Sequence, residues 1–401
     1  MKRCVGVTNC LVPMPRGHLS HSSSAWRRLT AVLAVPLAIG CGRASSSPAP
    51  EKTSAFLVSY ADIASVGYAA AFADARALSK SIDAFVREPS AAGLNAARVA
   101  WILARKSYAQ TEAYRFYGGP IDAVELLVNT WPIDENYLES EDGRSGIVAD
   151  EAAYPELSPR ALSALNLQQG ETSVSTGYHA IEFLLWGRDR SATGPGERSF
   201  HDYDTAPHAR RRAAYLQAAA ALLVENLASV DAAWKGEYRA AFLARPAEQA
   251  LALAVKGLGS LSGGELLGER LTVAYETRSQ ENEHSCFSDN THEDLRFDAL
   301  GIQNVCRGRY ADVERGVGLT ELVRGASPAL GSELDQDVAA AVEAVGAIPA
   351  PFDQAILGDD AAPGRVAIQR AMLALRNEAD AFAKVASTLN LRLQPAAVRG
   401  P

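Results

Sequence analysis

The chain has 401 residues, which is enough for two domains or for one large domain with a sizeable core. Aromatic residues make up only 7%, Ala and Leu are frequent and β-branched runs are sparse, so we expect a mostly helical protein. The formal net charge is −8, and the rest of the chain is more acidic still, because the first forty residues contain five basic residues and no acidic one. This charge argues against nucleic acid or an anionic lipid surface as a partner and is compatible with binding cations.

The N-terminal segment has the pattern of a bacterial export signal. Two arginines precede the apolar run 29–40, which is too short to span a bilayer as a stable anchor. The tetrapeptide 38–41, AIGC, is similar to a lipobox and predicts that Cys41 becomes the acylated first residue of a lipoprotein. An ordinary secreted protein is the alternative. We therefore expect a signal peptide over residues 1–40, with Met14 as an alternative start.

The residues after Cys41 predict where the mature protein lies. Gly42 follows the pattern for sorting to the outer membrane, so we expect a cell-envelope protein whose lipid anchor holds it on the outer membrane, facing the periplasm. Residues 41–54 are rich in Ser and Pro and predict a disordered tether.

The first ordered region should consist of two helices. Apolar residues at 63, 66, 70, 73 and 77 predict an amphipathic helix that ends near Arg87, and a second helix is expected over 90–116. One face of this second helix would carry two arginines, a glutamate and aromatic residues, which favours a buried polar network; a solvated face with salt bridges is the alternative. The residues on that face are Trp101, Arg105, Tyr108, Glu112 and Arg115.

Two Pro-Ile-Asp sequences follow, at 120–122 and 132–134. In each of them Asp122 or Asp134 lies near the start of a helix or turn, where a carboxylate is favoured by the helix dipole, so capping is the expected role of both.

The segment 176–187, TGYHAIEFLLWG, is apolar almost all round and should form a buried helix. His179 and Glu182 are three residues apart within it, which places them on one helix face. A buried carboxylate must be compensated, and a metal ion bound jointly with His179 would compensate Glu182. A hydrogen-bonded pair with a purely structural role, closed by a neighbouring arginine, is the alternative.

The Gly- and Pro-rich connection 191–204 is the best candidate for an internal boundary. Apolar stripes on long helices follow it, over about 216–234, 251–274 with a kink at Gly263-Gly264, and 368–389. Such helices joined by loops are typical of helical bundles. We expect an N-terminal bundle over 55–204 and a C-terminal bundle over 205–392.

A second polar cluster spans 280–294, QENEHSCFSDNTHED. A solvated acidic loop or a set of helix caps would also explain its composition. A disulfide between Cys286 and Cys306 is one option in an oxidising envelope. The residues of the cluster that are able to bind a metal include Glu283, His284, Asp289 and His292.

Five segments together resemble the imelysin-like family of bacterial cell-envelope proteins, in the same order: QTEAYRF (110–116), GGPID (118–122), NTWPID (129–134), GYHAIEFLLWG (177–187) and ENEHSCFSDNTHED (281–294). The fourth contains the family's G-x-H-x-x-E signature as Gly177, His179 and Glu182. The resemblance covers the chain from about residue 55 nearly to its end. It implies an all-α fold of two four-helix bundles packed together, an association with iron acquisition, and a classification as a metallopeptidase.

Our preferred hypothesis is an envelope protein that binds a metal ion, iron in preference to zinc, for capture or uptake, with iron-uptake components as its partners. Imidazole and carboxylate oxygens suit iron, and the interiors of helical bundles commonly hold such ligands. His179 and Glu182 would bind the ion, with Glu112 as the third ligand, and Arg105 or Arg115 would balance the charge.

Two alternatives remain. A metallopeptidase needs three protein ligands, an open position and a general base. Here His284 or His292 would supply the third ligand and Glu112 or Glu283 the base, since Tyr178 and Ala180 flank His179 and leave no adjacent glutamate. The other alternative is a binding module without a metal, in which the His–Glu pair only stiffens the junction of two bundles.

Overall fold

The structure is a computed structural model that describes residues 48–191 and 193–393. The predicted signal peptide, Cys41 and residues 42–47 of the predicted tether lie outside these residues. The predicted end of the tether at residue 54 is wrong, because helix α1 already begins at Pro50, a residue that is favoured in the first turn of a helix. Over the described part the chain is all-α apart from one antiparallel hairpin of two short strands, β1 (Arg309–Tyr310) and β2 (Val313–Glu314). The helices are α1 (Pro50–Arg87), α2 (Ala91–Ala109), α3 (Glu125–Val128), α4 (Glu135–Leu138), α5 (Pro159–Leu165), α6 (Gly177–Trp186), α7 (Ala209–Lys235), α8 (Glu237–Leu243), α9 (Ala247–Gly259), α10 (Val273–Thr277), α11 (Thr291–Arg307), α12 (Leu319–Ala326), α13 (Pro328–Gly346), α14 (Phe352–Ala355) and α15 (Pro363–Thr388).

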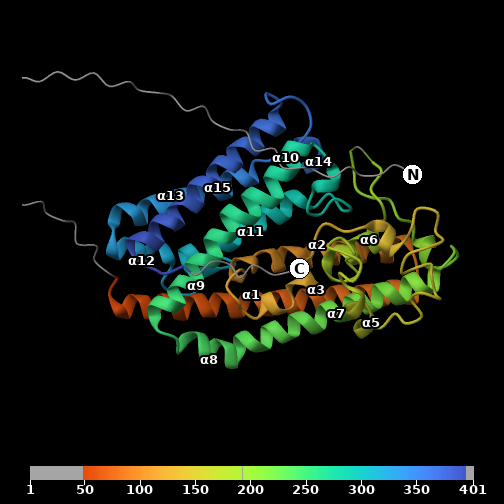
Figure 1. Cartoon of the computed structure of the whole chain (residues 1–401), viewed down its shortest axis with the longest axis horizontal. Coiled ribbons are helices and arrows are strands. Elements are labelled where there is room, and N and C mark those ends of the chain that lie inside the picture. The colour runs from red at the N-terminus through yellow and green to blue at the C-terminus, as the bar shows by residue number, and fades with distance from the viewer. Residues whose placement is uncertain (1–47, 192, 394–401) are drawn as a thin grey trace, which may run out of the picture. The chain divides into compact units, whose positions relative to one another are not determined.

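Helix α1 packs along both α2 and α7, and α6 packs against α2 and α7 (Figure 1). The predicted end of α1 is confirmed, because this helix stops at Arg87. Helix α2 begins after Ser90, whose side chain accepts a hydrogen bond from the backbone N–H of Gly93. The predicted buried stripe of α1 is partly wrong, because Ala73 and Ala77 are exposed. The buried face runs instead through larger residues, including Tyr68, Leu78, Ile82 and Phe85.

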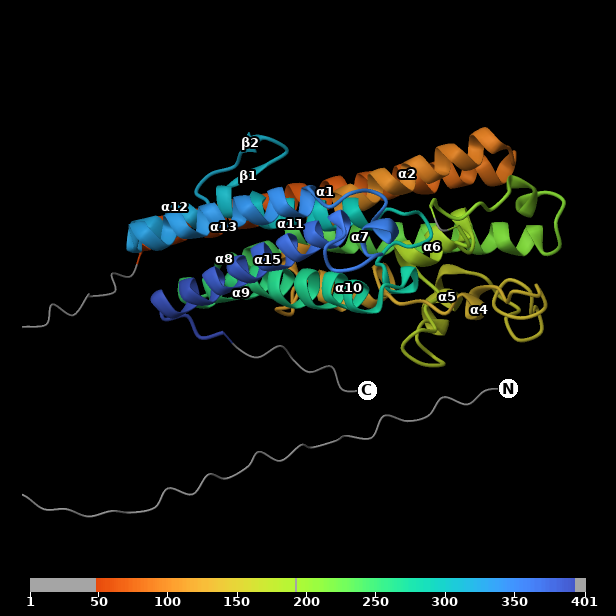
Figure 2. The same cartoon turned by 90° about the horizontal axis from the view of Figure 1, so that it is seen from above.

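A second group of helices contains α9, α11, α13 and α15. Helix α13 packs against α11, α12 and α15, and α15 also packs against α9 (Figures 1 and 2). Contacts of α1 with α9 and of α2 with α11 join this group to the first. The predicted division at 191–204 into two bundles stays a prediction; α7, which follows that point in the sequence, packs along α1 and α6.

The segment expected to kink at Gly263-Gly264 is helical throughout but changes its winding. Between α9 and α10 the residues Ser260–Thr272 form a π-helix, which we call the π segment. It packs against α15 and α11. π-helical turns are rare and occur frequently at functional sites, so the residues of this segment are candidates for a functional role.

Within the part of the chain that the structure describes, three helical segments are long and apolar enough, by length and composition alone, to cross a membrane: α1, α7 and Ala247–Thr277. Between 56% and 61% of the apolar window of each is buried inside the protein. Their apolar residues therefore contribute to the packing between the helices.

Candidate functional site

Helix α6 carries the G-x-H-x-x-E sequence, and all of its residues are buried. It begins at Gly177, which has a φ of 82°. A Cβ at this position would lie 2.5 Å from the carbonyl oxygen of Val128, at the end of α3. Only glycine combines that backbone conformation with such a close approach, so Gly177 determines how closely α6 packs on α3.

His179 and Glu182 face each other, with Nδ1 of His179 2.9 Å from Oε2 of Glu182. Both side chains are fully buried. Ser288 donates two hydrogen bonds to Oε1 of Glu182, from its backbone N–H at 2.9 Å and from its hydroxyl at 2.7 Å. The hydrogen-bond partners of Glu182 are thus an imidazole and a serine.

Burial shifts the protonation of both members of this pair. Desolvation raises the pKa of Glu182 well above its ordinary value, although the Ser288 hydrogen bonds act in the opposite direction. Desolvation also lowers the pKa of His179 well below its ordinary value, and the nearby His284 adds to this effect. We infer that the imidazole of His179 is neutral. Its second nitrogen, Nε2, is buried and has no hydrogen-bond partner.

A second imidazole, that of His284, lies against the first. The two ring centroids are 4.7 Å apart with an angle of 74° between the ring planes. The indole of Trp131 also contacts His179, with a centroid distance of 5.0 Å. Desolvation lowers the pKa of His284 to about 4, with Arg270 acting in the same direction. Both imidazoles are therefore neutral near pH 7, which is the form that binds metal ions.

Arg105 compensates a different carboxylate from the one expected. Its Nη2 lies 3.0 Å from Oδ2 of Asp294, and its Nη1 donates to Oδ1 of Asn129 at 2.5 Å. Nδ1 of His284 is 3.1 Å from the same Oδ2 of Asp294. Arg105 and Asp294 thus form a buried ion pair behind His284 and do not contact the His179–Glu182 pair directly.

Within the described residues, the hydrogen-bond and ion-pair partners of Glu112 are Arg115, Arg270 and Asn129, and not His179 or Glu182. Helix α2 ends at Ala109 rather than near residue 116, and Glu112 lies in a short 3₁₀ turn (Glu112–Tyr114). Its Oε2 is 2.5 Å from Nη1 of Arg115 and 2.6 Å from Nη2 of Arg270. Burial by itself would raise the pKa of Glu112, but Arg270 and Arg115 hold it at about 2. Glu112 is thus paired with two guanidinium groups, and the structure does not place it as the third ligand beside His179 and Glu182.

The π segment supplies two charged side chains that the sequence analysis did not single out. Arg270 and Glu265 are five residues apart, and the π-helical winding brings Nη2 of Arg270 to 3.0 Å from Oε1 of Glu265. Arg270 also pairs with the buried Asp298 of α11. In an ordinary helix an i,i+5 pair would not face the same side. No sequence signal identified this segment as π-helical.

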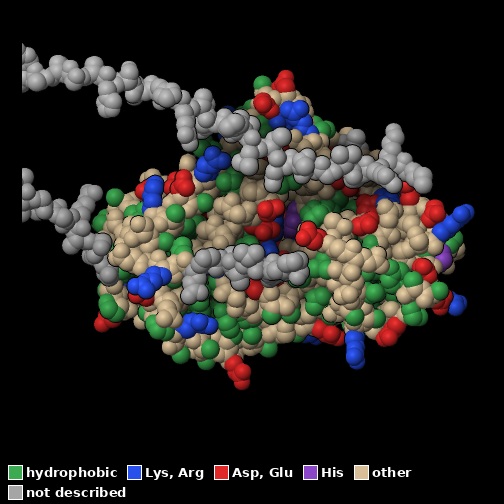
Figure 3. Space-filling model, viewed as in Figure 1, with side chains coloured by type: hydrophobic (Ala, Val, Ile, Leu, Met, Phe, Trp, Pro, Cys, Tyr) green, Lys and Arg blue, Asp and Glu red, His purple; other side chains and the backbone are tan. Residues whose placement is uncertain are grey.

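A cavity of about 330 Å³ opens beside these groups. Its lining carries His284 and Trp131 from the histidine side and Arg115, Glu265 and Arg270 from the other. Acidic side chains gather near the middle of the face shown in Figure 3. The buried histidine pair therefore lies next to a space that small groups can enter.

The two aspartates expected to cap helices bind backbone groups. Asp122 accepts hydrogen bonds from the backbone N–H groups of residues 116–119, at 2.7–3.2 Å. Asp134 caps α4 by accepting from the backbone N–H of Asn136 at 2.9 Å.

His292, in the first turn of α11, lies beside Glu293, with 4.0 Å between Nε2 and Oε1. Glu283 and Asp289 are buried and are not among the hydrogen-bond partners of the histidine pair.

The suggested disulfide is not formed. Cys286 and Cys306 are both free, buried thiols. Cys286 precedes α11, and Cys306 lies near its C-terminal end. The charged groups that act on the two thiols also differ: Glu182 and Glu283 act on Cys286, whereas Glu378 and Asp335 act on Cys306.

Among residues 48–191 and 193–393, no group of three or more His, Cys, Asp and Glu side chains is arranged to hold a metal ion. The described residues therefore do not provide the three-ligand set that a zinc peptidase requires. What they provide is a pair of adjacent neutral imidazoles, one of which is hydrogen-bonded to a carboxylate.

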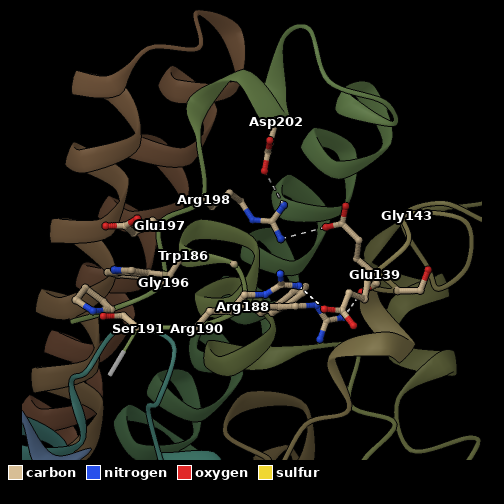
Figure 4. A pocket seen from close by; sticks show the side chains of 15 residues that line it. Glu139, Gly143, Trp186, Arg188, Arg190, Ser191, Gly196, Glu197, Arg198 and Asp202 are labelled. Carbon is tan, nitrogen blue, oxygen red and sulfur yellow. Dashed lines mark hydrogen bonds and ion pairs between the residues drawn. The ribbon is translucent and has the colours of Figure 1, made fainter. Parts of the chain in front are cut away.

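A larger cavity, of about 610 Å³, lies at the C-terminal end of α6 (Figure 4). Three arginines line it, and each is paired with a carboxylate. Arg198 lies 3.0 Å from Glu139, Arg190 lies 2.6 Å from Glu141, and Arg188 pairs with Glu135. Because its guanidinium groups are already neutralised, this cavity is a weaker candidate for the site than the histidine pair.

The comparison with known proteins agrees with the sequence resemblance. The family model for imelysin (Peptidase M75) matches residues 64–382. The chain is 30% identical over 336 residues to iron-regulated protein A of Synechococcus elongatus, covering 82% of each protein.

Two solved structures have a similar fold. A protein described as an iron-regulated protein A precursor, from Parabacteroides distasonis, has a TM-score of 0.70 at 20% identity and covers 86% of this chain and 97% of its own. An imelysin-like protein from Psychrobacter arcticum has a TM-score of 0.60 at 14% identity and covers 87% and 100%. The chain therefore belongs to the imelysin family.

Proposed function

We propose that this protein binds iron at the bacterial cell envelope, as cargo for capture or uptake, through His179 and His284. The observation that carries the proposal is the buried Nε2 of His179, which has no hydrogen-bond partner and belongs to a ring 4.7 Å from that of His284. A fully buried polar nitrogen without a partner is costly unless another group satisfies it. The name of the Synechococcus relative, iron-regulated protein A, supports iron as the metal.

Glu182 has a positioning role in this proposal. A metal-binding histidine usually donates its other ring N–H to a carboxylate or carbonyl, which fixes the tautomer and orients the ring. The contact of Nδ1 with Oε2 of Glu182 fits this arrangement when the charge of a bound cation keeps Glu182 ionised against the desolvation that raises its pKa. Ser288 holds the opposite oxygen of the carboxylate. Glu182 therefore orients His179 instead of sharing the ion with it.

Two imidazoles leave most of the coordination sphere of an iron ion to groups that arrive with it. Water or the oxygen atoms of a small chelator would supply them from the 330 Å³ cavity that His284 lines. Such a partly open site favours reversible loading and release, as a capture role requires.

Calorimetric titration of anaerobic Fe²⁺ into the purified protein tests the proposal. The wild type should bind one ion, and His179→Ala and His284→Ala should each weaken binding at least tenfold. The exposed His201 gives a matched control, because His201→Ala removes an imidazole outside the site. Absence of binding by the wild type, or equal binding by all three variants, would leave only the structural interpretation of the His–Glu pair.

The envelope location is a second part of the proposal. Acylation of Cys41 would hold the protein on the membrane, and the segment between Cys41 and the start of α1 at Pro50 would let the helical part face the periplasm. Metabolic labelling with a radioactive fatty acid should mark the wild-type protein and not Cys41→Ser. A labelled Cys41→Ser protein, or an unlabelled wild type in the membrane fraction, would contradict the anchor.

A further inference from the structure

We propose that the cavity of about 330 Å³ beside the histidine pair binds a small aromatic chelator of the catechol class, a single ring with two adjacent hydroxyl groups. The ring would pack on the indole of Trp131, and its two oxygen atoms would complete the coordination of the iron. This inference rests on the proposed iron site and names the class of ligand that arrives there with the metal.

Trp131 connects the cavity to the histidine pair. It lines the cavity together with His284. The ring centroid of Trp131 is 5.0 Å from that of His179, and the centroid of His179 is 4.7 Å from that of His284. A planar ligand that packs on the indole from the cavity is therefore close to both imidazoles. Aromatic rings prefer such offset or tilted contacts with each other, so the indole gives an aromatic ligand a defined place.

The cavity also has apolar side chains on its solvent side. Leu126 of α3 and Val273 of α10 line it and remain 40% and 38% exposed. Pro132 adds a further apolar surface next to Trp131. Exposed apolar side chains around a concave site are typical of ligand-binding grooves. A hydrated metal ion would leave these side chains in water, whereas an aromatic ring would cover them.

The charges of the lining favour a neutral ligand over an anion. Arg115 lies 2.9 Å from Glu125, and Arg270 lies 3.0 Å from Glu265. Both guanidinium groups of the lining are thus paired, and the exposed Glu269 adds a negative charge that would repel a phosphate or a carboxylate. Catechol enters as a neutral diol. Its two hydroxyl protons pass to the solvent when its oxygen atoms bind the ion.

The volume of the cavity selects a ligand with one ring. About 330 Å³ is near the lower limit of ligand pockets, which measure roughly 300–1,000 Å³. A single ring with two donor oxygens fits this space together with water. A macrocycle, or a chelator that surrounds the metal completely, needs more room and would also leave no position for the two imidazoles.

Titration of the purified protein with the 1:1 ferric complexes of catechol and of acetohydroxamate tests the inference. Both chelators offer two oxygen atoms, but only catechol has a ring. The visible charge-transfer band of each complex reports binding, and gel filtration shows whether iron and chelator elute with the protein in equal amounts. The wild type should bind the catechol complex at least tenfold more tightly. Equal affinity for the two complexes, or no binding of either, would overturn the inference.

Variants of Trp131 locate the ring. Trp131→Leu should weaken binding of the catechol complex about five- to tenfold, the size of an aromatic contact, and Trp131→Phe should restore most of it. Both complexes need the same histidines, so the ratio of the two affinities separates recognition of the ring from misfolding. An unchanged ratio in Trp131→Leu would overturn the inference.

A second pair of variants tests the apolar side chains of the cavity. Leu126→Gln/Val273→Thr should lower the preference for the catechol complex about threefold, because it makes the surface that the ring covers polar. Leu103→Gln/Val99→Thr is the matched control, since it makes the same replacements at exposed residues of α2 outside the cavity and should keep the full preference. Equal preferences in the two double variants would contradict the placement of the ring.

The Fe²⁺ titration contains no chelator and therefore tests the iron site separately. Binding of Fe²⁺ together with equal affinity for the two ferric complexes would refute the aromatic ligand and leave the proposed function intact. Absence of Fe²⁺ binding together with a preference for catechol that depends on Trp131 would refute binding of the bare ion and show that iron enters only as the chelate.

Discussion

Nδ1 of His179 lies 2.9 Å from Oε2 of Glu182, and this contact leaves Nε2 of the histidine as the one polar side-chain atom of the pair without a partner. The other carboxylate oxygen is held by Ser288. When Nδ1 of the neutral imidazole carries the proton, Nε2 has a free lone pair. The consequences of this arrangement can be tested residue by residue.

Glu182→Gln should reduce iron affinity by about 10–100-fold, the usual cost of losing a partner that orients a metal ligand. The amide can donate to Nδ1 of His179, which places the ring proton on Nε2 and removes the lone pair there. Stability should change by less than about 1.5 kcal/mol, because Gln keeps the shape of Glu and its carbonyl can still accept from Ser288. Calorimetric iron titration combined with urea unfolding separates the two effects, and unchanged affinity would contradict the positioning role.

Gly177→Ala should destabilise the protein by at least about 2 kcal/mol, since the φ of 82° is unfavourable for Ala and the new Cβ would lie 2.5 Å from the carbonyl oxygen of Val128. Gly264→Ala is the matched control. It lies in the π segment with open space around its Cβ position, so it should be neutral or stabilising by up to about 1 kcal/mol. Urea unfolding of the two variants beside the wild type measures both. Similar stabilities would show that α6 can move away from α3 at little cost.

Glu112→Gln should cost about 3 kcal/mol, because it removes the fully buried carboxylate that Arg115 and Arg270 share and leaves them only Glu125, Glu265 and Asp298 as countercharges. Glu265 binds the same two arginines from a more exposed position, so Glu265→Gln should cost about 1 kcal/mol.

The stabilising effect of Glu112 should also depend on pH. Since the pKa of Glu112 is held at about 2 in the folded protein, this effect is present above the unfolded pKa near 4.5 and is lost as the pH falls toward 2. Unfolding measured from pH 3 to 7 should therefore show the smallest difference between wild type and Glu112→Gln at the acid end.

Glu378→Gln should stabilise the protein, and more so as the pH rises. Burial raises the pKa of Glu378 to about 8, against an opposing hydrogen bond from Ser262. The folded state thus holds a proton that the unfolded state has released above about pH 4.5. Stability contributed by the protonated Glu378 is fully present below that pH and declines as the pH rises through about 8, by up to about 1.4 kcal/mol per pH unit. Urea unfolding at pH 6, 7, 8 and 9 should show the advantage of Gln growing to about pH 8 and then levelling off, and a constant difference would contradict this linkage.

Cys286 and Cys306 should both react with a thiol reagent once the protein is unfolded without reductant, and neither should react rapidly in the folded state, where both are buried. Cys286→Ser provides the control for counting thiols. A pair of peptides that separates only after reduction would contradict the free thiols of the structure.

The sequence by itself determined the helical class, because Ala- and Leu-rich segments with three- and four-residue apolar spacing can bury surface only as packed helices. It also determined the buried helix with His179 and Glu182, since their spacing and apolar surroundings are local properties. The family resemblance, now confirmed over residues 64–382, followed from short motifs in a fixed order.

Only the tertiary structure decided which distant groups surround that pair. The assignment of Glu112 depended on a helix that was expected to run to residue 116, but α2 ends at Ala109 and the chain turns toward Arg115 and Arg270. The pairing of His284 with His179, and the charges of the π segment, arise from contacts between segments about 100 residues apart or from an unusual helical winding. Periodicity reports which face of a helix is apolar, but which buried charge meets which is decided by packing between segments, where desolvation makes each match or mismatch worth several kcal/mol.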